Sequence, residues 1–144
     1  MKKKHPLLEA IYYNNNIEIV KLLIEYANQH QIILKLNEKD EYGWYPLLRA
    51  IYNNNIEIVK LLMEYANQHQ IILELNEKNK YGNNPLYCAI HNNNIEIVQL
   101  LIEYANQHQI ILEYKKKDIE YEPEIKKLLQ NYGKEMENRK KVIK

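Results

Sequence analysis

One sequence unit recurs three times along the chain, and this repeat constrains the fold more than any other feature. The string Asn-Asn-Asn-Ile-Glu-Ile-Val begins at Asn14, Asn53 and Asn92, so its copies are 39 residues apart. The string Glu-Tyr-Ala-Asn-Gln-His-Gln-Ile-Ile-Leu recurs with the same 39-residue spacing. A period of this length is typical of solenoids, in which each unit buries its apolar faces against its neighbours. We therefore expect a stacked array of repeats.

Each unit is predicted to form two helices joined by a short turn. The first helix begins at a Pro-Leu dipeptide, as at Pro46, because proline is well tolerated at the first position of a helix. The asparagine triplet then ends this helix, since Asn adopts left-handed backbone conformations and can cap the helix that follows. In the second helix the apolar residues at i, i+3, i+4, i+7 and i+8 form one buried stripe: Ile58, Leu61, Leu62, Tyr65 and Ala66.

The fold class expected is all-α, with three helix-turn-helix units and a C-terminal capping helix in a single domain over residues 1–144. The boundaries we assign are 5–43, 44–82 and 83–121 for the repeats and 122–144 for the cap and its tail. The segment 122–133 resembles a second helix alone, and its residues Ile125, Leu128 and Leu129 can cover the last repeat. The segment 134–144 is highly charged, and we expect it to fray.

The unit resembles the ankyrin repeat, which reads roughly Asp-x-x-Gly-x-Thr-Pro-Leu-His-x-Ala-Ala, a Gly-containing turn, Glu-Ile-Val-Lys-Leu-Leu-Leu and then Gly-Ala. The middle unit matches this pattern at Gly43, Pro46, Leu47, Ala50, Glu57, Ile58, Val59, Lys60, Leu61, Leu62 and Ala66. The third unit matches it at Gly82, Pro85, Leu86, Ala89, Glu96, Ile97, Val98, Leu100, Leu101 and Ala105. The first unit matches from Pro6 onward, so the resemblance covers about residues 5–114.

The chain departs from the family pattern in three ways. Tyr45 and Leu48 replace the family's Thr and His in the middle unit, and Asn54 stands where the turn glycine would be. Each unit is also about six residues longer than the usual 33. The extra length follows Ala66, so we expect either an extended second helix or an enlarged loop behind it. The alternation of Leu73-Glu74-Leu75 is in addition compatible with a strand.

The resemblance implies a protein-interaction module, because the family binds partners through its loop tips and the exposed side of its first helices. The three copies differ mainly on that concave surface, whereas their second helices are nearly identical. Aromatic and Arg side chains, which several of these positions carry, are enriched at binding hot spots. We expect these residues to form a protein-binding face: Trp44, Tyr45, Arg49, Tyr52, Tyr13, Asn83, Asn84, Cys88 and His91.

Two other functions stay open. In the first alternative, the protein is a structural spacer or a fragment of a longer ankyrin array and has no dedicated ligand. The abrupt start of the pattern at Pro6 favours the fragment. The decay of the pattern after Leu112 argues instead for a natural end there. In the second alternative, the Tyr- and Trp-rich face binds a small molecule or a sugar.

The sequence gives little support for a catalytic or a metal-binding site. Cys88 and His91 lie i and i+3 on one predicted helix, but the sequence supplies no recognisable oxyanion hole or orienting third group. His30, His69 and His108 would form a ladder with the spacing of stacked helices, about 8–10 Å. Ligands of one zinc ion must each lie about 2 Å from the metal. We therefore expect no enzyme activity, no metal and no cofactor.

Charge and composition restrict the class of partner. The net charge of +1 creates no field that attracts nucleic acid or an anionic membrane, and the basic clusters at 115–117 and 139–141 are typical of solvated surface. No apolar run is long enough for a membrane span or a secretory signal. The single cysteine, Cys88, excludes an intramolecular disulfide and fits a reducing compartment. We expect an intracellular, cytoplasmic monomer that binds a protein, without nucleic acid or membrane; the sequence does not identify that protein.

Overall fold

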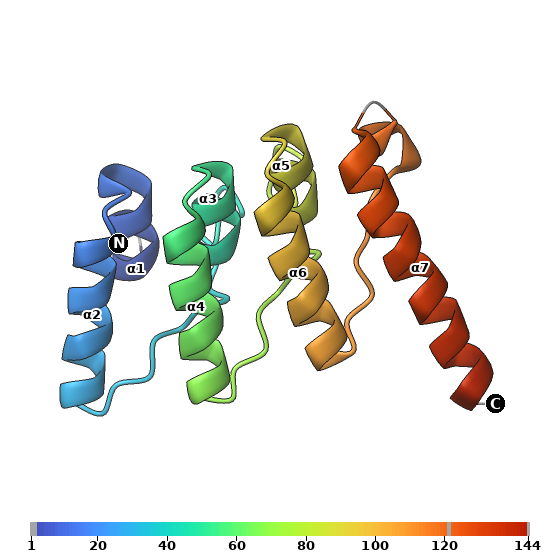
Figure 1. Ribbon diagram of the computed structural model, residues 1–144. Coiled ribbons are helices and arrows are strands. Elements are labelled where there is room, and N and C mark those ends of the chain that lie inside the picture. Colours follow the sequence, from blue (N-terminus) through green and yellow to red (C-terminus); the bar gives the residue numbers. More distant parts are fainter. Residues whose placement is uncertain (1–2, 121, 144) are drawn as a thin grey trace.

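The computed structural model describes residues 3–120 and 122–143, and the regular structure in this part of the chain is entirely helical. Helical layers stand side by side along one direction, so the predicted stack of repeats is confirmed (Figure 1). The first three layers contain α1 (Pro6–Glu9), the π-helix η1 (Ala10–Asn14) and α2 (Ile17–Gln29), then α3 (Pro46–Tyr52) and α4 (Ile56–Gln68), then α5 (Pro85–His91) and α6 (Ile95–His108). The last layer contains a 3₁₀ turn, η2 (Lys116–Ile119), and α7 (Pro123–Ile143).

In the second and third units, the asparagine triplet between the two helices performs three tasks, one for each residue. In the middle unit Asn54 has a φ of 58°, and this left-handed conformation reverses the chain. Asn55 caps α4, because its side-chain oxygen accepts a hydrogen bond from the Ile58 N–H at 3.1 Å. Asn53 donates its side-chain amide to the carbonyl of Ile11 in the preceding unit at 3.1 Å. The triplet therefore turns the chain, caps the second helix as predicted, and also joins neighbouring units.

The first unit carries one residue more than the other two before its asparagine triplet, at Tyr12-Tyr13. The π-helix η1 accommodates this insertion, because a π turn takes up one extra residue without ending the helix. Both tyrosines are exposed, with 44% of Tyr12 and 77% of Tyr13 accessible to solvent. The insertion therefore places two aromatic side chains where the other units have one.

The segment that follows each second helix is an extended loop, so the enlarged loop takes up most of the extra length of the unit. After α4, Gln70 adopts a left-handed φ of 58°. Leu73 and Leu75 are buried while Glu74 between them is exposed, so the alternation seen in the sequence is real. The backbone pairs with a side chain instead of a strand, since the Glu74 N–H donates to the Asn37 side-chain oxygen at 2.9 Å.

A buried tyrosine in α4 and another in α6 each fix the loop of the preceding unit. The hydroxyl of Tyr65 accepts a hydrogen bond from the Leu34 N–H at 2.9 Å, and that of Tyr104 accepts one from the Leu73 N–H at 3.0 Å. Both rings are almost fully buried, with 2% and 3% exposed. A backbone group that would otherwise be unsatisfied at the interface is thus paired in each step of the stack.

Helix α7 takes the place of the second helix of a fourth unit and covers the third repeat, as predicted for the cap. Ile125 and Leu129 are fully buried, and the Tyr132 hydroxyl accepts a hydrogen bond from the Leu112 N–H at 3.2 Å. The charged tail is helical within the described residues, because α7 continues to Ile143. No described helix has the length and apolar character needed to cross a bilayer.

Candidate functional site

The loops before α3 and α5, together with the first helices, form one hollowed side of the stack. The larger groove there has a volume of about 1100 Å³ and is lined by residues of the first unit and of both loops, including Tyr12, Tyr42 and Trp44. A smaller groove of about 430 Å³ lies between the second loop, α5 and the segment 113–118, and includes Tyr87. Tyr81 lines both grooves, so they adjoin at this residue.

The first of these loops is held by one carboxylate and one glycine. Asp40 accepts hydrogen bonds from the backbone N–H groups of Tyr42 at 2.9 Å and Trp44 at 3.0 Å. Gly43 has a φ of 83°, and a Cβ there would lie 2.8 Å from the Cα of Asn79 in the second loop. The turn exposes Tyr42 (48%) and turns Trp44 inward (7%), so it presents one aromatic side chain and buries the next.

Arg49, on α3, lies among three aromatic rings contributed by two units. Its Cζ is 3.9 Å from the ring centroid of Tyr12, 4.8 Å from that of Trp44 and 4.9 Å from that of Tyr52. Trp44 and Tyr52 also contact each other edge to face, with their centroids 5.0 Å apart. Each cation–π contact contributes about 0.5–1 kcal/mol at an exposed site. These contacts fix the guanidinium on the hollowed side; we call the four residues the Arg49 cluster.

The structure separates the nine predicted binding residues into an accessible and a buried group. The accessible residues are Tyr13, Tyr52 and His91, which are exposed, and Arg49 and Asn83, which are partly exposed. The buried residues are Trp44, Tyr45, Asn84 and Cys88. In this structure the side chains of the second group belong to the core, so the proposed surface is restricted to the first group and its exposed neighbours.

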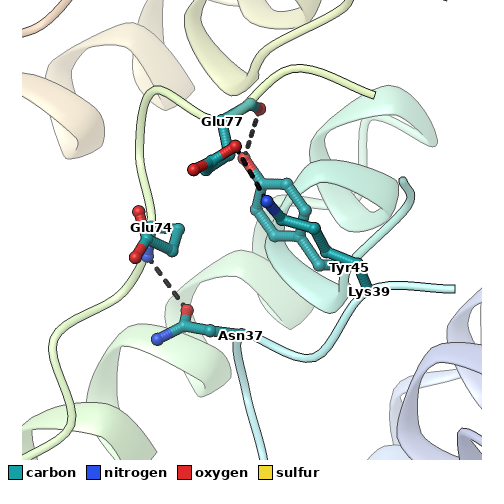
Figure 2. Close-up of polar contacts among 5 residues, drawn as sticks. All are labelled: Asn37, Lys39, Tyr45, Glu74 and Glu77. Atoms are coloured by element: carbon teal, nitrogen blue, oxygen red, sulfur yellow. Dashed lines mark hydrogen bonds and ion pairs between the residues drawn. The ribbon is translucent and has the colours of Figure 1, made fainter. Parts of the chain in front are cut away.

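Tyr45 is fully buried because it joins two successive loops (Figure 2). Its hydroxyl donates to the backbone carbonyl of Glu77 at 2.8 Å, and burial raises the pKa of the phenol well above its usual range. The Lys39 ammonium forms an ion pair with the Glu77 carboxylate at 2.8 Å, and Asn37 binds the Glu74 N–H nearby. Tyr45 is therefore part of the scaffold that positions the loops.

Asn84 and Cys88 are structural as well. Asn84 caps α5 by accepting a hydrogen bond from the Tyr87 N–H at 2.8 Å, and it donates to the Glu113 carbonyl at 3.3 Å. Burial raises the pKa of the Cys88 thiol to about 12, so the group stays protonated at neutral pH and is a poor nucleophile. His91 stacks on Tyr87, with ring centroids 6.0 Å apart.

Sequence reasoning missed part of the aromatic surface. It placed Tyr13 and not Tyr12 on the binding face, whereas Tyr12 contacts Arg49. It also omitted Tyr42 and Tyr81, which are 48% and 64% exposed. A signal for the last two exists, because each directly precedes the glycine of a loop turn, where side chains project outward.

The repeated histidines pack on tyrosines of their own helices. His69 lies against Tyr65 with ring centroids 4.1 Å apart, and His108 lies against Tyr104 at 4.2 Å. Nε2 of His108 is also 3.1 Å from the side-chain oxygen of Asn67 in the preceding unit. Within residues 3–120 and 122–143, no group of three or more His, Cys, Asp or Glu side chains is arranged to hold a metal ion.

The three helical layers that precede the cap match a known family of repeats. A family model described as ankyrin repeats matches residues 7–112 with three copies, which spans the three layers that precede the cap. A search of curated proteins finds no match.

Proposed function

Because the chain belongs to the ankyrin-repeat family, we propose that it binds a protein partner through the hollowed side formed by its loops and first helices. Ankyrin repeats generally serve as protein-interaction modules and are generally not enzymes. The family alone does not choose a surface, because function resides in particular side chains rather than in a fold.

The observation that carries the proposal is the concentration of exposed tyrosines on this side. Six tyrosines that line the two grooves or belong to the Arg49 cluster are at least 37% exposed: Tyr12, Tyr13, Tyr42, Tyr52, Tyr81 and Tyr87. Tyrosine combines a large apolar ring with a polar tip and loses little side-chain entropy on binding, so it is favoured at protein interfaces. We call these six residues the tyrosine surface.

Site-specific photo-crosslinking tests the location of this interface. A photoreactive amino acid placed at Tyr81 is expected to form a covalent adduct with a protein partner in lysate of the source cells. The same group placed at Gln68, an exposed residue at the end of α4, provides the matched control. Adducts that form at Gln68 and not at Tyr81 would overturn the proposed surface.

The outer face of α2 favours a second candidate function, in which the protein is one segment of a longer stack of repeats. Tyr26 is 56% exposed, whereas the equivalent Tyr65 and Tyr104 are buried against the unit before them. Leu22, on the same face, is 62% exposed. A further repeat packed on α2 would cover these side chains. Stabilisation by an added repeat supports this second function and leaves the first unaffected.

A further inference from the structure

We propose that Arg49 anchors a carboxylate of the partner, so that the recognised segment is a peptide with an acidic group among apolar residues. This inference rests on the proposed protein-binding function and specifies the chemistry of the partner. The carboxylate is an Asp or Glu side chain or a chain terminus, and these share the same planar pair of oxygens.

The Arg49 cluster holds a cation that is partly exposed to solvent. The centroids of Tyr12, Trp44 and Tyr52 lie 3.9–4.9 Å from the Arg49 Cζ, so three aromatic rings restrict the guanidinium. The N–H donors lie in the plane of the group and are not consumed by such contacts. Arg49 is thus pre-oriented, which lowers the entropy lost when it binds a bidentate acceptor.

Arg49 lacks an anionic partner among the residues that the structure describes. Its Nε is buried and makes no hydrogen bond, and the guanidinium forms no ion pair with any described carboxylate. Glu9, which occupies the Arg49 position in the first unit, is exposed and does not pair with it. A partly exposed guanidinium without an ion pair binds a carboxylate favourably, because charge-assisted hydrogen bonds are stronger than neutral ones.

The carboxylates near this site have other partners or roles. Asp40 caps the loop turn through two backbone N–H groups, and Glu38 pairs with Lys3, which lowers the pKa of the Glu38 carboxyl. Glu77 pairs with Lys39. Of these groups, Asp40 and Glu38 line the larger groove and add negative charge there, so a single carboxylate fits the site better than a polyanion such as nucleic acid.

Trp44 supplies a direct readout of binding, because it is the only tryptophan in the chain and its ring lies 4.8 Å from the Arg49 Cζ.

Three N-acetylated peptides with the same Gly and Leu residues serve as probes. The first has a central Glu and an amidated C-terminus, the second a central Gln and a free C-terminus, and the third a central Gln and an amidated C-terminus. We expect a saturable change in Trp44 fluorescence with a carboxylate peptide, and binding of the neutral peptide at least about tenfold weaker.

Variants assign the effect to Arg49. Arg49→Gln should reduce affinity for the carboxylate peptide to that of the neutral one, and Arg49→Lys should restore it only partly, because Lys lacks the planar fork. Lys39→Gln, which removes a cation from the groove that Tyr12 and Trp44 line, is the matched control and should retain affinity. Cooperative thermal unfolding of each variant establishes that it is folded. The first two peptides distinguish a side-chain from a terminal carboxylate.

Three results would overturn the inference: equal affinity for charged and neutral peptides, unchanged affinity in Arg49→Gln, or no binding of either carboxylate peptide at millimolar concentration. Adduct formation at Tyr81 together with any of these results would retain the protein-binding surface and remove only the carboxylate anchor. Failure of both experiments would remove the proposed function itself.

Discussion

At the scale of single residues, tyrosines at equivalent positions of the second helices lie in different environments. Tyr104 is buried, and its hydroxyl accepts a hydrogen bond from the Leu73 N–H and donates one to the Ile71 carbonyl at 3.4 Å. Burial accordingly raises the pKa of Tyr104. Tyr26 holds the same place in α2 but is 56% exposed. The position in the stack, rather than the residue type, decides whether the hydroxyl contributes to stability.

Tyr104→Phe is expected to lower the free energy of unfolding by about 1–3 kcal/mol, because the Leu73 N–H loses its acceptor while remaining buried. Tyr26→Phe is the matched control and should change stability by less than about 0.5 kcal/mol. Urea unfolding followed by circular dichroism measures both values. Equal effects of the two substitutions would mean that the buried hydrogen bonds do not stabilise the stack.

Cys88 should be protected from thiol reagents in the native protein. Burial raises the pKa of its thiol from an ordinary value of 9.0 to about 12, so little thiolate exists at pH 8 and the sulfur is inaccessible. A raised thiol pKa stabilises the native state below pH 9, and this contribution is lost as the pH rises toward 12, because the unfolded thiol ionises first. Reaction with a chromogenic disulfide at pH 8 should be at least about 100-fold slower in buffer than in urea. Equal rates would show that the thiol is accessible in the folded protein.

At the scale of elements, the loops depend on contacts that each makes with the next. Gly43 and Gly82 occupy equivalent turns with φ of 83° and 80°, but only at Gly43 does the neighbouring loop approach closely. The Lys80 N–H in the second loop donates to the Tyr42 carbonyl in the first at 2.9 Å. The two loops therefore pack as a pair, whereas a side chain at Gly82 would meet open space.

Gly43→Ala should consequently destabilise the protein more than Gly82→Ala. Both substitutions place a Cβ on a left-handed residue, which costs about 1 kcal/mol. At Gly43 the Cβ would in addition meet the Cα of Asn79 at 2.8 Å, so the loops must separate. Thermal unfolding of the two variants gives the comparison, and an equal decrease in Tm would show that the close approach of the loops is unimportant.

The sequence predicts the helices and their turns well because these depend on local chemistry. The Pro-Leu starts and the caps at Asn55 and Asn94 need no information from the rest of the chain. The loop after each second helix is less predictable, since its backbone pairs with groups of another unit, such as Asn37. The one-residue insertion at Tyr12-Tyr13 is visible in the sequence, but its accommodation as a π turn is not.

The candidate site was only partly predictable, because variation between copies does not distinguish surface from core. Tyr45 and Asn84 differ in type and were assigned to the binding face for that reason. Both are buried and make the same bridge, since each donates to a backbone carbonyl of the following loop, at Glu77 and Glu113. The positions of Arg49 and Tyr52 also differ between the copies, but these two side chains are accessible. Whether a variable residue is buried or accessible depends on how the loops pack.

At the scale of the whole molecule, the two ends of the stack differ in chemistry. Helix α7 carries Lys126 and Gln130 where α6 has Val98, which is fully buried, and Ile102, which is partly buried. The outer face of the last layer is therefore polar, whereas the face of α2 at the other end exposes Tyr26 and its apolar neighbours. Helices α2 and α7 form the two ends of the stack (Figure 1), and we expect a further repeat to pack on α2 rather than on α7.

Fusion of a copy of residues 44–82 ahead of the first repeat should raise the Tm by at least about 4 °C, because stability in repeat arrays grows with each interface between neighbours. In the fused protein the Tyr26 hydroxyl should accept a hydrogen bond from a loop N–H of the added repeat. Tyr26→Phe should therefore become destabilising there. An unchanged Tm, or a Tyr26→Phe variant that stays neutral, would show that α2 does not accept a repeat in this way.

The central claim is that a protein partner binds the tyrosine surface, and the dissociation constant of the partner crosslinked at Tyr81 tests it most directly. Tyr52→Ala/Tyr81→Ala removes two exposed rings, and the control Lys60→Ala/Gln68→Ala removes two exposed side chains from α4. We predict that the first variant binds at least about tenfold more weakly, as hot-spot residues do, and that the control binds as the wild type does. Equal affinity of the wild type and Tyr52→Ala/Tyr81→Ala would contradict the claim.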